Sequence, residues 1–282
     1  MPTAVIDGIT THYETAGSGA PLLMYSPGGF DSSLENWKSL GKYRTLNLVD
    51  HLSAKYRCIL FDRRESGLSG GRVERIGWGD YVSQGKGLLD HLGIDRAHLM
   101  GGCVGCSSVA AFAVAYPEAV MSMVLFSPAG GPAYRMKQHS RLAVHLAYVA
   151  EYGLEQVVAL AKSGDSSFTK DPRVGPWVTV IRTDAAFAER YAHGDPERYG
   201  VIVSGVFRLM FDRDTVPGAE PEDLMQLDVP ALIVPGQDSS HAPSAARYLH
   251  ECLTGAQYWD VPVVEQTEAT VLARVLAFFD SV

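Results

Sequence analysis

Short apolar runs recur along this chain and predict the strands of a buried sheet. Each run is four to six residues long and rich in aliphatic side chains, as expected for strands covered on both faces. The runs lie at 21–25, 57–61, 97–100, 121–126 and 231–235. Helical patterns near 46–56, 80–92 and 107–116 separate the first four runs. This alternation predicts an α/β fold with a mostly parallel central sheet flanked by helices.

The segment from 130 to 228 interrupts this alternation. It contains amphipathic helical patterns at 142–162, 178–191 and 199–211, but no core strand. A helical insertion between two strands is typical of a lid over the carboxyl ends of the strands, where open α/β sheets bind their ligands. We therefore expect a core formed by residues 1–129 and 229–282 and a helical lid formed by residues 130–228.

Composition and charge narrow the classes of partner. The formal net charge is −8 and there is no basic run, which argues against nucleic acid or an anionic membrane surface as a partner. The absence of a leader pattern, of a long apolar span and of a cysteine-rich framework predicts a cytoplasmic protein. Neither a metal-ligand spacing nor a dinucleotide-binding pattern occurs, so we expect no metal and no cofactor. A small-molecule substrate is then the expected partner, and the oligomeric state, a homo-oligomer included, stays open.

The stretch from Gly101 to Gly105 carries the most specific chemical signal. It has the pattern Gly-x-Cys-x-Gly between an apolar run and a small-residue helix, which is the context of a nucleophile elbow. The start of the helix favours negative charge, so the thiol of Cys103 is the candidate nucleophile. The alternative is a small buried cysteine in a protein without catalytic activity. Cys106 completes a Cys-x-x-Cys spacing, but the elbow context favours a structural role for it over a redox role.

Four segments in the same order along the chain resemble the α/β-hydrolase superfamily. One is the elbow. Segment 26–30 follows a strand, where the family places its oxyanion loop, and segment 62–69 resembles the family turn Asp-x-Arg-Gly-x-Gly-x-Ser. Segment 235–243 follows the next-to-last strand, where the family carries its catalytic acid. The resemblance implies an α/β-hydrolase core whose oxyanion would be held by the N–H groups of Val104 and of Gly28 or Gly29.

The departures from this family pattern concern the catalytic base. The family's histidine follows the last strand, and that position is occupied here by Asp260; no histidine occurs after His250. His241, three residues after Asp238 in the 235–243 loop, is therefore the candidate base, with Asp238 as its orienting acid. Asp260 and Glu65, which replaces a family glycine, are candidate pocket carboxylates, and the alternative for both is a solvated loop residue.

These observations support a hydrolase with a cysteine nucleophile, acting on an activated acyl group such as an ester, a lactone, a thioester or a C–C bond of a β-dicarbonyl compound. Aromatic residues of the 130–228 segment favour an apolar or aromatic substrate. Two other hypotheses stay open. A lyase or acyltransferase could use the same scaffold, since the altered base position concerns water activation, and a catalytically silent protein could bind a small ligand.

Overall fold

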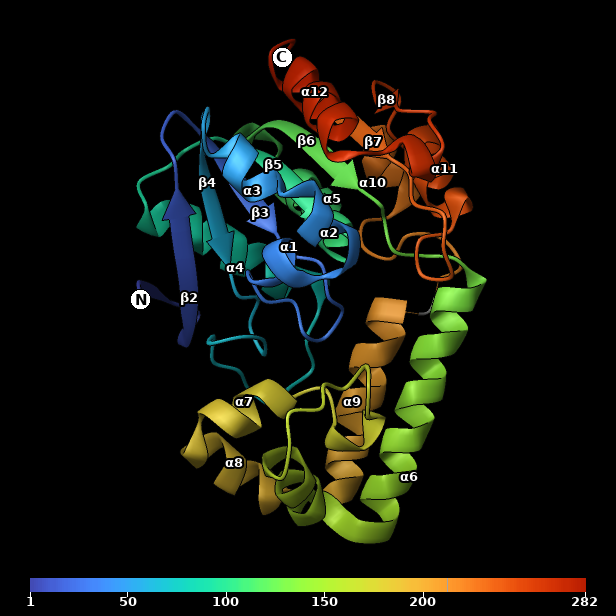
Figure 1. The fold of residues 1–282 in the computed structure, drawn as a ribbon. Coiled ribbons are helices and arrows are strands. Elements are labelled where there is room, and N and C mark those ends of the chain that lie inside the picture. Colours follow the sequence, from blue (N-terminus) through green and yellow to red (C-terminus); the bar gives the residue numbers. More distant parts are fainter. Residues whose placement is uncertain (212) are drawn as a thin grey trace.

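An eight-stranded sheet runs through the centre of the protein in the computed structural model, which describes residues 1–211 and 213–282 (Figure 1). The strand order is β1-β2-β4-β3-β5-β6-β7-β8. β1 and β2 pair antiparallel with each other, β2 pairs antiparallel with β4, and the remaining strand pairs are parallel. The strands are β1 (Thr3–Ile6), β2 (Ile9–Ala16), β3 (Ala20–Tyr25), β4 (Tyr56–Phe61), β5 (Ala97–Gly102), β6 (Val120–Phe126), β7 (Ala231–Val234) and β8 (Gln257–Tyr258). The α/β fold expected from the sequence is confirmed.

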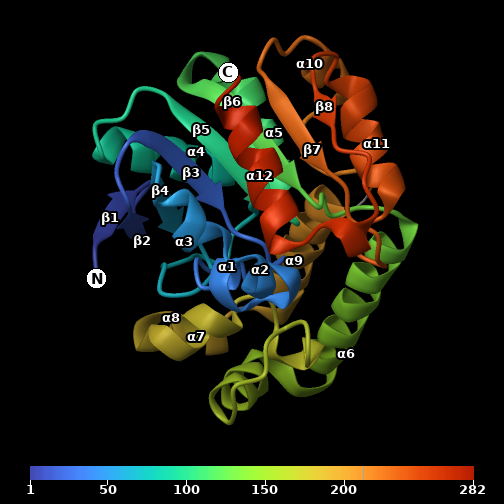
Figure 2. The same ribbon diagram turned by 45° about the horizontal axis from the view of Figure 1, so that its top comes forward.

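Helices cover both faces of this sheet, because successive strand residues point to opposite sides. On one face Leu23 and Ile59 pack with α4 (Trp78–His91), α5 (Gly105–Ala115) and α11 (Pro243–Cys252). On the other face Leu22 and Cys58 pack with the short helices that follow β3 and with the C-terminal helix, which crosses the sheet in Figure 2. These helices are α1 (Asn36–Ser39), α2 (Gly41–Leu46), α3 (Leu48–Leu52) and α12 (Glu268–Phe279). The strands are therefore buried on both sides, as their apolar runs predict.

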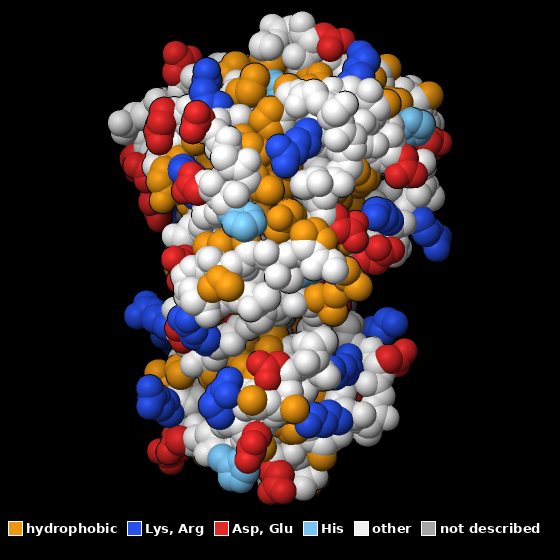
Figure 3. Space-filling model, turned by 90° about the vertical axis from the view of Figure 1, so that its left-hand side faces the viewer, with side chains coloured by type: hydrophobic (Ala, Val, Ile, Leu, Met, Phe, Trp, Pro, Cys, Tyr) orange, Lys and Arg blue, Asp and Glu red, His pale blue; other side chains and the backbone are white. Residues whose placement is uncertain are grey.

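Between β6 and β7 the described residues form a helical insertion at one end of the sheet (Figure 1). Its helices are α6 (Pro132–Lys162), α7 (Val178–Thr183), α8 (Ala185–Ala192) and α9 (Pro196–Phe211). The next helix, α10 (Pro221–Met225), packs instead on α5 and α11 of the core. Short 3₁₀ turns complete the fold at η1 (Pro117–Ala119), η2 (Pro172–Val174) and η3 (Val263–Glu265). The insertion has its own apolar cluster, which also takes in Phe30 and Val104 from the core. Figure 3 shows that the molecular surface narrows between the core and this insertion.

Two of the expected helices differ from the structure. The single helix expected over 178–191 is wrong, because Asp184 leaves the helical conformation and its side chain accepts a hydrogen bond from the N–H of Phe187, which starts a new helix. The helix expected near 46–56 is present but shorter: α3 covers Leu48–Leu52, and the chain enters β4 at Tyr56. A further break lies inside α6, where Gly153 has a φ of 78° and kinks the helix.

Candidate active site

The strand–turn–helix expected around Cys103 is present. β5 ends at Gly102, α5 begins at Gly105, and Cys103 between them has a φ of 55°, in the left-handed region that most side chains avoid. Both flanking glycines are required by close packing: a Cβ atom on Gly105 would lie 2.2 Å from the carbonyl oxygen of Tyr25, and one on Gly101 would lie 2.5 Å from Gly105. The turn therefore projects the Cys103 side chain from a strained and tightly packed backbone.

Cys103 is partly exposed, whereas the other three cysteines are buried. The thiol of Cys106 donates to the carbonyl oxygen of Gly101 at 3.1 Å, and burial raises its pKa well above the usual value. Cys106 therefore has the structural role that the elbow context favours. Burial also raises the pKa of Cys58, to about 12, and that of Cys252. These three thiols are both hidden and neutral at physiological pH.

Iodoacetamide is expected to alkylate Cys103 at least about tenfold faster than Cys58, Cys106 or Cys252, because only thiolates react and the other thiols are buried and protonated. A time course of peptide mass spectrometry measures the four rates in one sample. In denaturant the four rates should become similar. Equal labelling in the folded protein would contradict the assignment of Cys103 as the reactive thiol.

His241 and Asp238 form a hydrogen-bonded pair in the loop after β7. The Nδ1 atom of His241 lies 2.8 Å from Oδ2 and 2.9 Å from Oδ1 of Asp238. The Asp238 carboxylate also accepts from the N–H of Ser240 at 2.7 Å. Burial acts to raise the pKa of Asp238, but the hydrogen bonds from His241 and Ser240 outweigh it and lower the pKa below its usual range. A charged carboxylate on Nδ1 holds the imidazole in one orientation and leaves Nε2 free to bond another group.

Segment 127–130 connects this loop to the elbow. The N–H of Ala129 donates to the carbonyl oxygen of Cys103 at 3.3 Å, and the N–H of Gly130 donates to that of Ser240 at 3.0 Å. Gly130 and His241 also form an isolated parallel bridge. Since β5, β6 and β7 are parallel neighbours, their carboxyl ends meet at one edge of the sheet. The sheet and this segment therefore bring together side chains that are far apart in the sequence.

The Nε2 atom of His241 is buried and faces the thiol of Cys103. No group in the described part of the chain makes a hydrogen bond of ordinary geometry with this atom, and Cys103 is the group that acts most strongly to raise the pKa of the imidazole. Burial lowers the pKa of His241, but Cys103 and then Asp238 outweigh burial and raise the pKa to about 9. At neutral pH the imidazole is therefore protonated.

This raised pKa makes the stability of the protein depend on pH through His241. The histidine has a pKa near 6.5 when unfolded and about 9 when folded, so its contribution is complete below pH 6.5 and is lost as the pH rises through 9. The measurement is the unfolding free energy in urea between about pH 6 and about pH 10. Over this range it should fall more in the wild-type protein than in His241→Gln, and the extra fall should be roughly 3 kcal/mol at most. Parallel curves for the two proteins would contradict the pairing.

Three backbone N–H groups, one in the elbow and two in the loop after β3, have no partner among the described residues. Within the described ranges no carbonyl or side chain accepts a hydrogen bond from the N–H of Val104, Gly28 or Gly29. Gly28 has a φ of 130°, and a Cβ atom there would lie 2.2 Å from the carbonyl oxygen of Asp31, so the tight turn of this loop requires glycine. Free donors next to a nucleophile are what the oxyanion of an acyl-transfer reaction requires.

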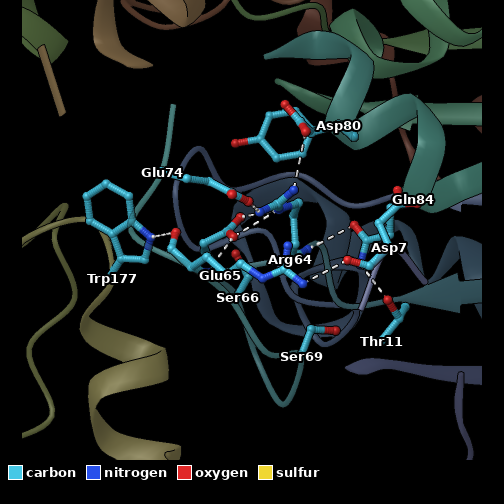
Figure 4. A network of polar contacts seen from close by, with 12 residues as sticks. Asp7, Thr11, Arg64, Glu65, Ser66, Ser69, Glu74, Asp80, Gln84 and Trp177 are labelled. Atoms are coloured by element: carbon cyan, nitrogen blue, oxygen red, sulfur yellow. Dashed lines mark hydrogen bonds and ion pairs between the residues drawn. The ribbon is translucent and has the colours of Figure 1, made fainter. Parts of the chain in front are cut away.

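Asp260 and Glu65 lie away from Cys103. Asp260 is exposed and lines a surface depression with Gln237 and Arg247. No hydrogen bond or ion pair of the described residues joins it to Cys103 or His241. Glu65 is buried in a polar network around Arg64, shown in Figure 4, and its φ of 66° lies in the left-handed region.

The network around Arg64 holds the loop after β4 in place. The Arg64 guanidinium contacts Glu65 at 2.9 Å, Asp80 at 3.4 Å and Glu74 (Figure 4). Burial raises the pKa of Glu65, the Arg64 charge opposes this, and the net value is about 7. The insertion is attached beside this network, because the indole N–H of Trp177 donates to the carbonyl oxygen of Arg72 at 3.0 Å. The position of Glu65 is therefore that of a loop-stabilising group.

The sequence pattern did not point to Lys42 or Tyr134, which the structure places near the thiol. Burial lowers the pKa of Lys42 to about 8, against the opposing charges of Asp238, Cys106 and Cys103. Burial and then the charge of Cys103 raise the pKa of Tyr134 well above its usual value. Lys42 lies in α2 and Tyr134 in α6, so no local motif links either residue to the elbow.

A cavity of about 340 Å³ lies between residues 71–73 and α8–α9, and neither Cys103 nor His241 lines it. We locate the candidate site from the convergence of the thiol, the imidazole and the free N–H groups, because these are the groups that carry chemistry. The described residues contain no group of three or more His, Cys, Asp or Glu side chains that could hold a metal ion. Within the same residues no helix is long and apolar enough to cross a membrane.

Solved structures of known enzymes have the same fold as this chain. The enol-lactonase from Burkholderia xenovorans superposes with a TM-score of 0.63 at 20% identity, over 99% of this chain and 100% of that one. The meta-cleavage product hydrolase from Pseudomonas fluorescens superposes with a TM-score of 0.62 at 20% identity, over 100% of this chain and 98% of that one. At this identity the likeness concerns the fold alone.

Sequence relatives match part of the chain more closely. The 2-hydroxy-6-oxo-6-phenylhexa-2,4-dienoate hydrolase of Comamonas testosteroni is 36% identical over 120 residues, which are 42% of this chain and 40% of that protein. The 2-hydroxy-6-oxononadienedioate/2-hydroxy-6-oxononatrienedioate hydrolase of Paraburkholderia phymatum is 37% identical over 133 residues, 45% of this chain and 44% of that protein. The chain thus matches less than half the length of these relatives. Residues 21–162, half of the chain, match the model of the alpha/beta hydrolase fold, and the chain therefore belongs to the alpha/beta hydrolase fold family.

Proposed function

We propose that this protein is a hydrolase that uses Cys103 as its nucleophile on an activated acyl group of a small apolar or aromatic molecule. One observation carries the proposal. The thiol of Cys103 faces the free nitrogen of an imidazole whose other nitrogen is held by Asp238, next to N–H groups without partners. This is the series of nucleophile, base and orienting acid that acyl transfer requires. Esters, lactones, thioesters and C–C bonds of β-dicarbonyl compounds present such a group.

The acylation step follows from these positions. The Cys103 sulfur attacks the substrate carbonyl, and the resulting oxyanion accepts hydrogen bonds from the N–H of Val104 and of Gly28 or Gly29, each worth about 3–4 kcal/mol in the transition state. As the C–O, C–S or C–C bond breaks, the protonated His241 gives its proton to the leaving group. The products of this step are the free leaving group and a thioester on Cys103.

Deacylation uses the same residues in the opposite protonation state. His241, now neutral at Nε2, takes a proton from a water molecule, and the oxygen of that water attacks the thioester carbonyl. The C–S bond breaks, the acid product leaves, and the thiolate and imidazolium are restored. Asp238 stays ionised throughout and stabilises the imidazolium, which agrees with its lowered pKa.

Aromatic side chains near Cys103 support an apolar or aromatic substrate. The ring of Phe30, in the loop after β3, packs on that of Phe211 of α9 with 5.6 Å between the ring centres. The ring of Phe211 in turn packs on that of Tyr134 of α6, with 5.7 Å between the ring centres. Cys103 packs against the apolar cluster that contains these rings. We propose that residues 130–228 act as a lid on the core of residues 1–129 and 229–282 and move to admit substrate. The Comamonas relative is named for a phenyl-substituted substrate, in agreement with this class.

Mass spectrometry with 4-nitrophenyl butyrate tests the proposal directly. We expect a burst of nitrophenolate equal to the enzyme concentration, followed by slower turnover, with one butyryl group on the peptide that contains Cys103. Neither the burst nor the adduct should form in Cys103→Ala. An adduct that accumulates in water but transfers to an added thiol would instead indicate an acyltransferase. No adduct in the wild-type protein would overturn the covalent mechanism.

A further inference from the structure

Arg63, which follows β4, is a buried cation that forms no ion pair with any residue the structure describes. Its side chain is 4% exposed, and its guanidinium lies over the ring of Tyr81, 4.3 Å from the ring centre. One nitrogen, Nη2, donates to the carbonyl oxygen of Gly29. The other two, Nε and Nη1, are buried and have no hydrogen-bond partner in the described part of the chain.

The neighbouring Arg64 shows what a buried guanidinium normally requires. It is as deeply buried as Arg63, and three carboxylates surround it, those of Glu65, Glu74 and Asp80. Among the described residues Arg63 makes no such ion pair. A guanidinium removed from water and left unpaired costs several kcal/mol, so buried cations are ordinarily paired. The two free nitrogens of Arg63 are therefore positioned for an anion that none of the described residues supplies.

One contact and one electrostatic effect link this cation to the candidate active site. Its partner Gly29 belongs to the loop after β3 whose free N–H groups we propose as oxyanion donors. In addition, the charge of Cys103 acts to raise the pKa of Tyr134 and the charge of Arg63 acts to lower it, so both groups lie near the same side chain. The Arg63 charge also acts, against burial, to lower the pKa of Asp31 and of Glu65, but neither carboxylate is ion-paired with it. An anion at Arg63 would thus lie next to the loop that we propose holds the oxyanion.

We propose that Arg63 binds a carboxylate of the substrate, so that the enzyme is specific for small apolar or aromatic acids that carry the reacting acyl group elsewhere in the molecule. This inference rests on the proposed function, because it assumes attack by Cys103. A planar guanidinium with two free nitrogens suits a carboxylate, which accepts two parallel N–H bonds. The aromatic rings of Phe30, Phe211 and Tyr134 would cover the apolar part of the same molecule.

A matched pair of esters tests the assignment. 4-Nitrophenyl butyrate is neutral, whereas mono-4-nitrophenyl glutarate has a similar chain that ends in a carboxylate. We expect the wild-type protein to prefer the glutarate ester, and Arg63→Gln to lower kcat/KM for that ester by about 10- to 100-fold. Arg63 also holds Gly29, so Arg63→Gln should lower kcat/KM for the neutral ester as well, but by a clearly smaller factor than for the glutarate ester. Arg63→Lys should keep part of the preference because it keeps the charge. Arg208→Gln, the same substitution at an exposed position of α9, should change neither ester.

Binding of benzoate separates this proposal from the proposed function. Calorimetry on Cys103→Ala should detect benzoate binding that is lost in Cys103→Ala/Arg63→Gln. Benzoate binding that depends on Arg63, without a thiol adduct from either ester, would refute the catalytic role of Cys103 and retain the carboxylate site. Two results would instead overturn the role of Arg63 and retain the nucleophile, provided that the thiol adduct forms. One is an equal loss of kcat/KM for both esters in Arg63→Gln. The other is benzoate binding that is absent, or that is unchanged by Arg63→Gln.

Discussion

Cys103→Ala is expected to lower kcat/KM on an activated ester by about 10⁴-fold or more, the range seen when a catalytic nucleophile is removed. The side chain projects from a left-handed turn, so a small residue at this position should keep the backbone in place. The measurement is steady-state hydrolysis of 4-nitrophenyl butyrate, with circular dichroism as the control for folding. Residual activity within tenfold of wild type would refute the role of Cys103.

Cys103→Ser is the sharper form of this test, because it restores the residue that the family usually has. We expect it to fold and yet to turn over poorly, since a hydroxyl group is hardly ionised at neutral pH and depends on a base within about 3 Å. His241 makes no hydrogen bond of ordinary geometry even with the larger sulfur atom, and a serine oxygen lies closer to its own backbone. Activity equal to wild type would show that His241 reaches a hydroxyl fully and that the thiol is not needed.

His241→Ala is expected to lower kcat/KM by about 10²- to 10⁴-fold, the usual contribution of a positioned acid–base group. The imidazole is the titratable group that faces Cys103 and is held by Asp238, so its loss removes both the proton donor of acylation and the base of deacylation. The measurement is kcat/KM against pH on an alkyl thioester, whose leaving group needs a proton. In the wild type the acylation rate should fall as the pH rises through 9, because His241 then loses its proton.

Asp260→Ala is the matched control for the base. Asp260 occupies the family's histidine position in the sequence, but its side chain is exposed and not bonded to Cys103 or His241. We therefore expect less than about a threefold change in kcat/KM, the size typical of a surface substitution away from the reacting groups. A larger loss in Asp260→Ala than in His241→Ala would move the active-site assignment to Asp260.

The architecture of the core could be predicted from local sequence. Runs of four to six aliphatic residues, separated by helical periodicity, specify buried parallel strands wherever they occur, and β3 to β7 lie where those runs lie. The turn at Cys103 was equally predictable, because its two glycines and the flanking strand and helix are all contained in one short stretch. Helix breaks were less predictable: Asp184 and Gly153 fit an amphipathic pattern, and only their backbone angles end or bend the helices.

The sequence by itself determined the α/β class, the helical insertion and the position of Cys103, because each depends on neighbouring residues. Only the tertiary structure decided which distant groups join the thiol. His241 comes to it because parallel strands end at one edge and segment 127–130 connects the two loops. Asp260, at the expected position in the sequence, stays on the surface. Arg63 and Arg64 are adjacent, yet three carboxylates surround Arg64 whereas Arg63 forms no ion pair with any described residue, a difference set by what packs around each side chain in three dimensions.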